Sequence, residues 1–145
     1  MDFNEMKQIC RDLLYQEKIS QHAKIGDAVC VIVSDSNKYY TGLSLVASAN
    51  VGFCAEQAAI SEMIKSHETI MKQMLVLDKF GNVFPPCGKC LELITALNEA
   101  NRNCIVYLNV DTSVTIEKLY PFDWKIIKDN FKRKKYYKTK RRDIL

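Results

Sequence analysis

The sequence has few glycines and prolines, and it contains no long apolar run. Among its 145 residues are 5 glycines and 3 prolines, while 48% of the residues are hydrophobic and 26% are charged. This composition excludes collagen-like repeats, low-complexity sequence and intrinsic disorder. No apolar run approaches the roughly 18 residues that a membrane span requires, and the start of the chain lacks the basic and apolar regions of a signal peptide. We therefore expect a cytoplasmic protein with no membrane segment.

Charge is distributed unevenly along the chain. Residues 1–124 contain 11 basic and 15 acidic side chains, a net charge of −4, whereas residues 125–145 contain 10 and 2, a net charge of +8. Phe131, Tyr136 and Tyr137 lie among the basic side chains of this tail. Such a mixture can follow a nucleic-acid backbone and stack on its bases, although charge runs are more often solvated surfaces. We divide the chain into a domain over residues 1–124 and a basic C-terminal helix or tail over residues 125–145.

Hydrophobic periodicity predicts alternating helices and strands. Apolar residues at helical spacing predict helices over residues 3–16, 54–66 and 88–101. Apolar, β-branched and alternating runs predict five strands, over residues 27–34, 38–45, 73–78, 104–109 and 113–116. Because strands alternate with helices, we expect an α/β fold with three α/β/α layers, in which a five-stranded mixed sheet has helices on both faces.

Six cysteines in a chain without a secretion signal indicate metal or redox chemistry rather than a disulfide framework. Three of them, Cys10, Cys30 and Cys104, lie in apolar patterns, and we expect them to be core thiols. His22 and His67 lie in polar stretches and are predicted to be surface residues rather than metal ligands.

The other three cysteines belong to two short motifs at predicted helix starts: Cys54-Ala55-Glu56, and Pro85-Pro86-Cys87-Gly88-Lys89-Cys90. Both helices follow strands in an alternating pattern, so their N-termini are expected at the same end of the sheet. Three thiolates on one Zn²⁺ leave a fourth tetrahedral position open, which is typical of a catalytic zinc site. Glu56, two residues after Cys54, is then close enough to move protons without binding the metal.

Together the two motifs resemble the signature of the zinc-dependent nucleoside and nucleobase deaminases, H/C-x-E followed by P-C-x-x-C. The motif pattern is most similar to that of the small cytidine deaminases and blasticidin S deaminase, which use three cysteines and have Pro-Cys-Gly in the second motif. Leu119-Tyr120-Pro121 is similar to the Leu-Leu-Pro stretch of those enzymes. The resemblance covers most of residues 1–124. It implies a catalytic domain that hydrolyses an aminopyrimidine, a cytosine nucleoside or an analogue such as blasticidin S, to its oxo product and ammonia.

The resemblance also implies a role for each residue of the motifs. Cys54, Cys87 and Cys90 bind Zn²⁺. Glu56 takes a proton from the zinc-bound water, protonates the ring nitrogen and then passes a proton to the leaving ammonia. The backbone of Ala55 hydrogen-bonds the ring carbonyl of the base, and the carbonyl of Pro85 holds the departing amine.

Two further substrate contacts and an assembly are implied. Trp124 lies where an aromatic residue of the relatives stacks on a base, often in a neighbouring subunit, although a core or interface role is the alternative. Asp27 aligns with a pocket-lining position and would meet a cationic substrate group, although a solvated strand-start carboxylate is the commoner case. Sites shared between subunits imply a homo-oligomer, a tetramer or a dimer.

The chain departs from the cytidine deaminase pattern at two places. Ser44 and Val46 stand where an Asn and a Glu of those enzymes bind the ribose hydroxyls. Because valine accepts no hydrogen bond, we expect poor discrimination in favour of ribose, which makes blasticidin S deaminase the nearer analogue. Gln57 and Leu91 stand where relatives often carry an arginine that offsets the thiolate charge. This leaves Lys89 and the helix dipoles as the positive charges that would offset the thiolates.

Two other functions remain open at this point. The basic tail would suit a deaminase that binds or edits nucleic acid, for which steeply salt-dependent binding is the expected sign. The Cys87-x-x-Cys90 pair would also suit a non-catalytic zinc or redox protein. Glu56 argues against this last function, because a purely structural zinc site has no need of that carboxylate.

Overall fold

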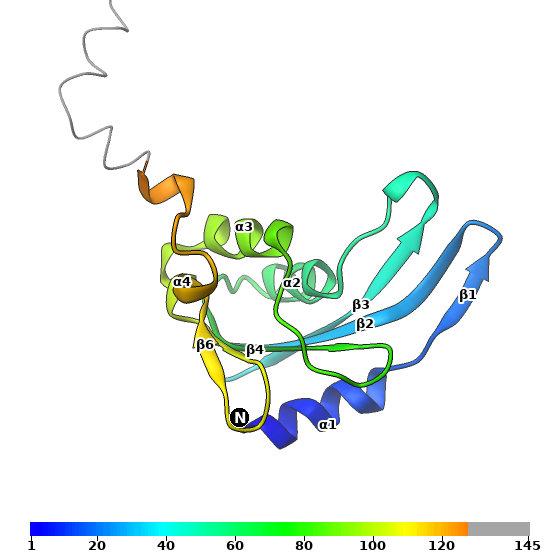
Figure 1. Ribbon diagram of the computed structural model, residues 1–145, viewed down its shortest axis with the longest axis horizontal. Helices are drawn as coiled ribbons and strands as arrows, with labels where there is room; N and C mark the ends of the chain where they lie inside the picture. Colours follow the sequence, from blue (N-terminus) through cyan, green and yellow to red (C-terminus); the bar gives the residue numbers. More distant parts are fainter. Residues whose placement is uncertain (128–145) are drawn as a thin grey trace, which may run out of the picture.

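The computed structural model describes residues 1–127, which form one sheet with helices on both of its faces (Figure 1). The helices are α1 (Phe3–Leu13), α2 (Ala55–Lys65), α3 (Gly88–Leu97) and the short α4 (Ile116–Leu119). The strands are β1 (Glu17–Ser20), β2 (Ala23–Ser34), β3 (Tyr39–Ala47), β4 (Met71–Asp78), β5 (Ile105–Tyr107) and β6 (Ser113–Thr115). There are also two 3₁₀ helices, η1 (Ser48–Asn50) and η2 (Glu99–Asn103), and residues 124–127 are helical. None of the helices within residues 1–127 is both long and apolar enough to cross a membrane.

Strand β2 is the centre of the sheet and its longest strand. It pairs antiparallel with β3 along most of its length, while its start pairs with β1 and its second half with β4. Strands β4 and β5 are parallel, and β6 closes the edge antiparallel to β5. The sheet is therefore mixed, as the sequence predicts, and the crossover from β4 to β5 contains α3.

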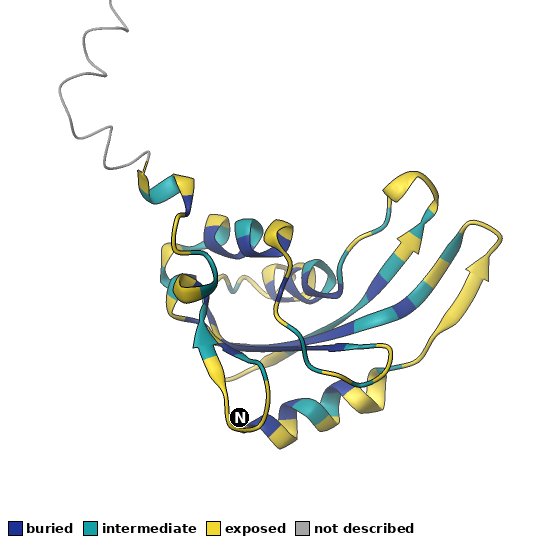
Figure 2. Cartoon of the chain, in the orientation of Figure 1, coloured by how far each residue is buried: buried dark blue, intermediate teal, exposed yellow. Residues whose placement is uncertain are grey.

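Side chains along β2 point alternately to the two faces of the sheet, so the core is divided into two layers. Val29, Val31 and Val33 pack with α1, whereas Cys30 and Ile32 pack with α2 and α3 on the other face. All five side chains are at most 2% exposed. Figure 2 shows the middle of the sheet as buried and the strand ends beyond it as exposed. This confirms the three-layer α/β/α fold.

The sheet has six strands rather than the five expected. The missed strand, β1, has four exposed residues (EKIS) and pairs only with the start of β2. A strand that buries neither face shows no apolar alternation, so the sequence pattern could not reveal it. The helix predicted over residues 88–101 ends at Leu97, because Asn98 is extended and η2 follows.

The residues after α4 form ion pairs with the C-terminal half of the domain. Asp123 is fully buried and its carboxylate lies 3.1 Å from Nη2 of Arg102 and 3.2 Å from Nζ of Lys125. Lys125 also lies 2.8 Å from the Glu92 carboxylate on α3. Lys125, the first residue of the predicted tail, thus forms ion pairs with two side chains of the preceding residues. Residues 128–145, most of the predicted basic tail, lie outside the described residues, and the proposed division at residue 124 stays a prediction.

Candidate active site

Two helix N-termini bring the three motif cysteines together. Cys54 is the N-cap of α2, Cys87 is the N-cap of α3, and Cys90 lies in the first turn of α3. The Sγ atoms of Cys54 and Cys87 are 4.0 Å apart, and those of Cys87 and Cys90 are 3.7 Å apart. All three sulfurs lie within 4.8 Å of one another, and none of these cysteines is in a disulfide.

The spacing of the sulfurs fits a zinc ion. In a tetrahedral site with Zn–S bonds of about 2.3 Å, neighbouring sulfurs are about 3.8 Å apart. The two sulfur separations given above, 4.0 and 3.7 Å, are close to that value. Three cysteine ligands leave the fourth position open, and Cys87 is exposed while Cys90 is buried. The cluster therefore fits a zinc site that is reached from the surface.

Glu56 lies beside this cluster and is almost completely buried. Its residue is 3% exposed, and it lines the same pocket as Cys54 and Cys87. Burial raises the pKa of the Glu56 carboxyl, while a hydrogen bond from its own backbone N–H and one with the Cys90 thiol act in the opposite direction. A buried carboxyl in the pocket that reaches a metal cluster is suited to proton transfer.

Burial also raises the pKa of the Cys54 and Cys90 thiols, and the charge of Glu56 adds to this effect. Their deprotonation therefore needs a compensating positive charge. The N-termini of α2 and α3 both point their partial positive charge at the sulfurs. Lys89 lines the pocket as well and is a basic side chain beside the cluster. The Gln57 side chain caps the start of α2, since its Oε1 accepts a hydrogen bond from the Cys54 backbone N–H at 3.0 Å.

A pocket of about 360 Å³ opens over the cysteines and Glu56. Of the predicted substrate-contact residues, Ser44, Ala55 and Asp27 line it. The Ser44 hydroxyl is already engaged, because it accepts the Ala28 backbone N–H at 2.8 Å. Asp27 is paired as well, with Lys24 at 2.9 Å and with the side-chain amide of Gln16 at 2.7 Å.

Two other predicted contact residues lie outside the pocket lining of this chain. Pro85 is exposed and follows Phe84, which does line the pocket. The Trp124 residue is 50% exposed, and its indole N–H donates to Glu92 at 2.9 Å. Their roles toward substrate stay predictions. Cys10, Cys30 and Cys104 are buried, and His22 and His67 are exposed, as expected.

Sequence reasoning missed the aromatic walls of the pocket, Phe53 and Phe84. Phe53 is held by a backbone pair with Leu45, in which its N–H donates at 2.9 Å and its carbonyl accepts at 3.0 Å. Phe84 precedes Pro85 and donates its N–H to the Val76 carbonyl at 3.2 Å. Each phenylalanine lies within three residues of a motif cysteine, and this proximity was the available signal.

The sequence matches the family described as the cytidine and deoxycytidylate deaminase zinc-binding region over residues 5–107. The chain belongs to this family. A search of curated proteins gives no match. The zinc-dependent deaminase chemistry that the two motifs imply is thus the chemistry of the family, and the cysteine cluster fits its metal.

Solved structures show the same fold. The cytidine deaminase of Mycobacterium tuberculosis superposes with a TM-score of 0.69 at 16% identity, covering 84% of this chain and 96% of that one. The cytidine deaminase of Bacillus anthracis superposes with a TM-score of 0.66 at 17% identity, covering 88% and 92%. The cytidine deaminase fold therefore extends over nearly all of the described residues.

Proposed function

We propose that this deaminase hydrolyses the exocyclic amine of a small aminopyrimidine, a cytosine nucleoside or an analogue such as blasticidin S. The single observation that carries the proposal is the cluster of three thiols beside a pocket that two of them line together with one buried carboxylate, Glu56. The pocket volume of about 360 Å³ is suited to a small ring with a modest substituent. The solved structures of similar fold are named as cytidine deaminases, which agrees with this substrate class.

In this proposal the Sγ atoms of Cys54, Cys87 and Cys90 hold the zinc ion. When bound, Zn²⁺ supplies Lewis acidity that lowers the pKa of a water molecule to near neutrality. Glu56 would take one proton from that water while the water oxygen bonds to the amine-bearing ring carbon, and would deliver this proton to the ring nitrogen. It would then transfer the second proton of the water to the amine, so that the carbon–nitrogen bond breaks, ammonia leaves and the added oxygen remains as the ring carbonyl. Burial raises the pKa of Glu56, which favours a carboxyl that both accepts and donates protons in one cycle.

The remaining residues orient the ring in this proposal. The Ala55 backbone, in the first turn of α2, binds the ring carbonyl, and the Pro85 carbonyl accepts from the departing amine. Phe53 and Phe84, the two aromatic residues of the pocket lining, provide apolar contact for the ring. Ser44 offers a hydroxyl that is already bonded to Ala28, and Val46 offers no polar group, so the sugar contributes little to binding.

A homo-oligomer, a tetramer or a dimer, is part of the same proposal. The exposed Trp124 would then stack on a base in a neighbouring subunit, since it does not line the pocket of its own chain. The basic residues beyond position 127 leave nucleic-acid binding as a prediction that no described residue supports.

An ammonia-release screen tests the proposal. The zinc-loaded full chain is incubated with cytosine, cytidine, deoxycytidine, dCMP, blasticidin S and unrelated aminoheterocycles. We expect ammonia from at least one cytosine compound or from blasticidin S. We also expect the rate to fall by about 10²-fold or more in Glu56→Ala. Glu62→Ala, which removes an exposed carboxylate of the same helix, is the matched control and should retain activity.

A wild-type chain that holds zinc and releases no ammonia from any aminopyrimidine would contradict the proposal. Equal rates in Glu56→Ala and wild type would contradict the role of Glu56.

A further inference from the structure

The loop between β3 and α2, residues 48–54, contains two residues in an unusual backbone conformation. Ala49 has a φ of 54° and Asn50 a φ of 57°, so both lie in the left-handed region. That region is sterically unfavourable for residues with a Cβ, although asparagine adopts it more often than alanine does. Two such residues in succession indicate local strain, and strained residues are concentrated at active and ligand-binding sites.

Backbone contacts on both sides of Asn50 hold the loop in this conformation. Before it, the Ser48 N–H donates to the His22 carbonyl at 3.0 Å. After it, Phe53 and Leu45 exchange two backbone hydrogen bonds, of 2.9 and 3.0 Å. The fold therefore keeps Asn50 at a fixed place although its backbone conformation is unfavourable.

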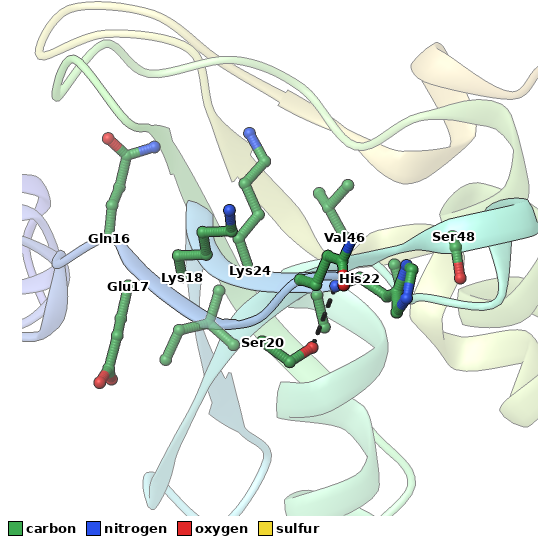
Figure 3. A pocket seen from close by; sticks show the side chains of 12 residues that line it. Gln16, Glu17, Lys18, Ser20, His22, Lys24, Val46 and Ser48 are labelled. Carbon is green, nitrogen blue, oxygen red and sulfur yellow. Dashed lines mark hydrogen bonds between the residues drawn. The ribbon is translucent and has the colours of Figure 1, made fainter.

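Two pockets lie at the end of β3, and Asn50 lines one of them. The larger, of about 580 Å³, is lined by the β1–β2 hairpin and the end of β3, and it includes only Ser48 of the loop (Figure 3). Asn50 instead lines the pocket of about 360 Å³ that contains Cys54 and Glu56. A molecule whose ring lies over the cysteines can therefore contact Asn50.

Two other polar side chains of this pocket are already engaged. The Ser44 hydroxyl accepts the Ala28 backbone N–H at 2.8 Å, and Asp27 is paired with Lys24 at 2.9 Å. The side-chain amide of Asn50, by contrast, forms no hydrogen bond with any group in residues 1–127. An amide has two N–H donors and a carbonyl acceptor, so it can bind either a hydroxyl or another amide.

The charge of the pocket lining indicates which kind of group fits beside Asn50. Lys89 lies in the first turn of α3 between two of the cysteines, so its charge belongs to the metal end of the pocket. Residues 48–53 of the loop contain no charged side chain. A charged group beside Asn50 would lose hydration without gaining a counter-charge from the loop, which is unfavourable. The loop is therefore suited to an uncharged hydrogen-bonding group.

We propose that Asn50 is a specificity-determining residue, whose side-chain amide hydrogen-bonds an uncharged hydroxyl or amide group on the substituent that the substrate ring carries. The inference rests on the proposed function, because the ring of the same molecule must lie over the zinc cluster. Because Ser44 is engaged and Val46 is apolar, the loop rather than β3 supplies this hydrogen bond. Asn50 contributes to binding and takes no part in the hydrolysis.

The test compares cytidine and blasticidin S with cytosine, which has the ring but no substituent. On the zinc-loaded full chain it measures kcat/KM for the compounds that react and, in a Glu56→Gln background that prevents turnover, the affinity by calorimetry. Asn50→Gly removes the amide and introduces a residue that adopts a positive φ without strain. We expect it to lower the affinity for cytidine or blasticidin S, relative to cytosine, by about twofold to tenfold, the effect of one neutral hydrogen bond.

Ala49→Gly is the matched control. It relieves the same kind of strain one residue earlier and removes no polar group, so it should leave the relative affinities unchanged. Neither substitution should lower the urea midpoint appreciably, because the relief of strain offsets the extra freedom of glycine in the unfolded chain. A loss of affinity in Asn50→Gly alone is then not explained by weaker folding.

A loss for cytidine alone would identify a hydroxyl as the bound group, and a loss for blasticidin S alone would identify an amide. Equal relative affinities in wild type and Asn50→Gly would overturn the inference and leave the proposed function intact. An equal loss in Ala49→Gly would overturn it too, since only the loop conformation would then matter. Asn50-dependent binding by a wild-type chain that releases no ammonia would support the contact and refute the proposed function.

Discussion

Gly42 on β3 is packed directly against the first turn of α2, so closely that a Cβ on Gly42 would lie 2.4 Å from the carbonyl oxygen of Ala55. The same Cβ would lie 2.4 Å from the backbone nitrogen of Ala59. Both contacts are with helix backbone, which cannot move aside without moving the whole helix. Since Cys54 and Glu56 flank Ala55, this close approach fixes the position of a proposed ligand and of the proposed proton carrier.

Gly42→Ala should therefore push α2 away from the sheet. We expect a loss of about 1 to 3 kcal/mol in the free energy of unfolding, the range for overpacked cores, together with weaker zinc retention. Urea unfolding and metal analysis after dialysis against a chelator measure the two effects. Gly88→Ala is the matched control, because a Cβ there meets nothing within 4 Å, and its stability should change by less than about 1 kcal/mol. Equal effects at both glycines would contradict the account of Gly42.

The ionisation of Asp123, near the C-terminal end of the described residues, should make the stability of the protein depend on pH in acid. Burial by itself would raise the pKa of Asp123, but the hydrogen bond from the Lys125 backbone N–H and the Lys125 ammonium lower it on balance. A carboxyl whose folded pKa is lowered stabilises the fold fully above its unfolded pKa of about 3.9, and this stabilisation disappears as the pH falls further. The ion pair with Lys125 at 3.2 Å and the hydrogen bond from the Lys125 backbone N–H are structural sources of the lowered pKa.

Asp123→Asn should destabilise the protein by about 3 kcal/mol at pH 7, because Arg102 is left buried without its partner. The difference from wild type should shrink as the pH is lowered through 4 toward 2. Urea unfolding at several pH values measures it, with Asp111→Asn, an exposed aspartate, as the control. A difference that stays constant down to pH 2 would show that the charge of Asp123 is unimportant.

Thiol reactivity should separate the three core cysteines from the two cysteines of the metal cluster that are exposed or half-buried. Burial raises the pKa of Cys10 and of Cys104 to about 12, and that of Cys30 is raised as well. These three thiols should resist alkylation near pH 8 until the protein is unfolded. Once a chelator has removed the metal, Cys87, which is exposed, and Cys54, which is half-buried, should react in the folded protein. Peptide mapping by mass spectrometry identifies the modified residues, and early labelling of Cys10 would contradict the predicted core.

The positions of the three cysteines and Glu56 could be predicted because they depend on local structure. Each motif lies at the start of a helix, where the change from strand to helix is visible in the sequence itself. The pocket walls were harder to predict, since Phe53 reaches its place through a backbone pair with Leu45 and not through any periodic pattern.

The contacts of Glu92 were hidden for a different reason. Its carboxylate accepts from Tyr120 and Trp124 and pairs with Lys125, all about thirty residues further along the chain. From the sequence alone, charged residues on a helix are predicted to lie on a solvated surface. Only the fold shows which of them form contacts with residues that are distant in the sequence. Strand β1 escaped prediction because its four residues are exposed, so no apolar alternation marks it.

The zinc content of the freshly purified full chain tests the central claim most directly. The account predicts about one zinc ion per chain in wild type and in Glu56→Gln, and almost none when Cys54, Cys87 and Cys90 are all replaced by serine. It would be contradicted by wild-type protein that contains no zinc and a disulfide between two of these cysteines, or by a triple variant that holds as much zinc as wild type.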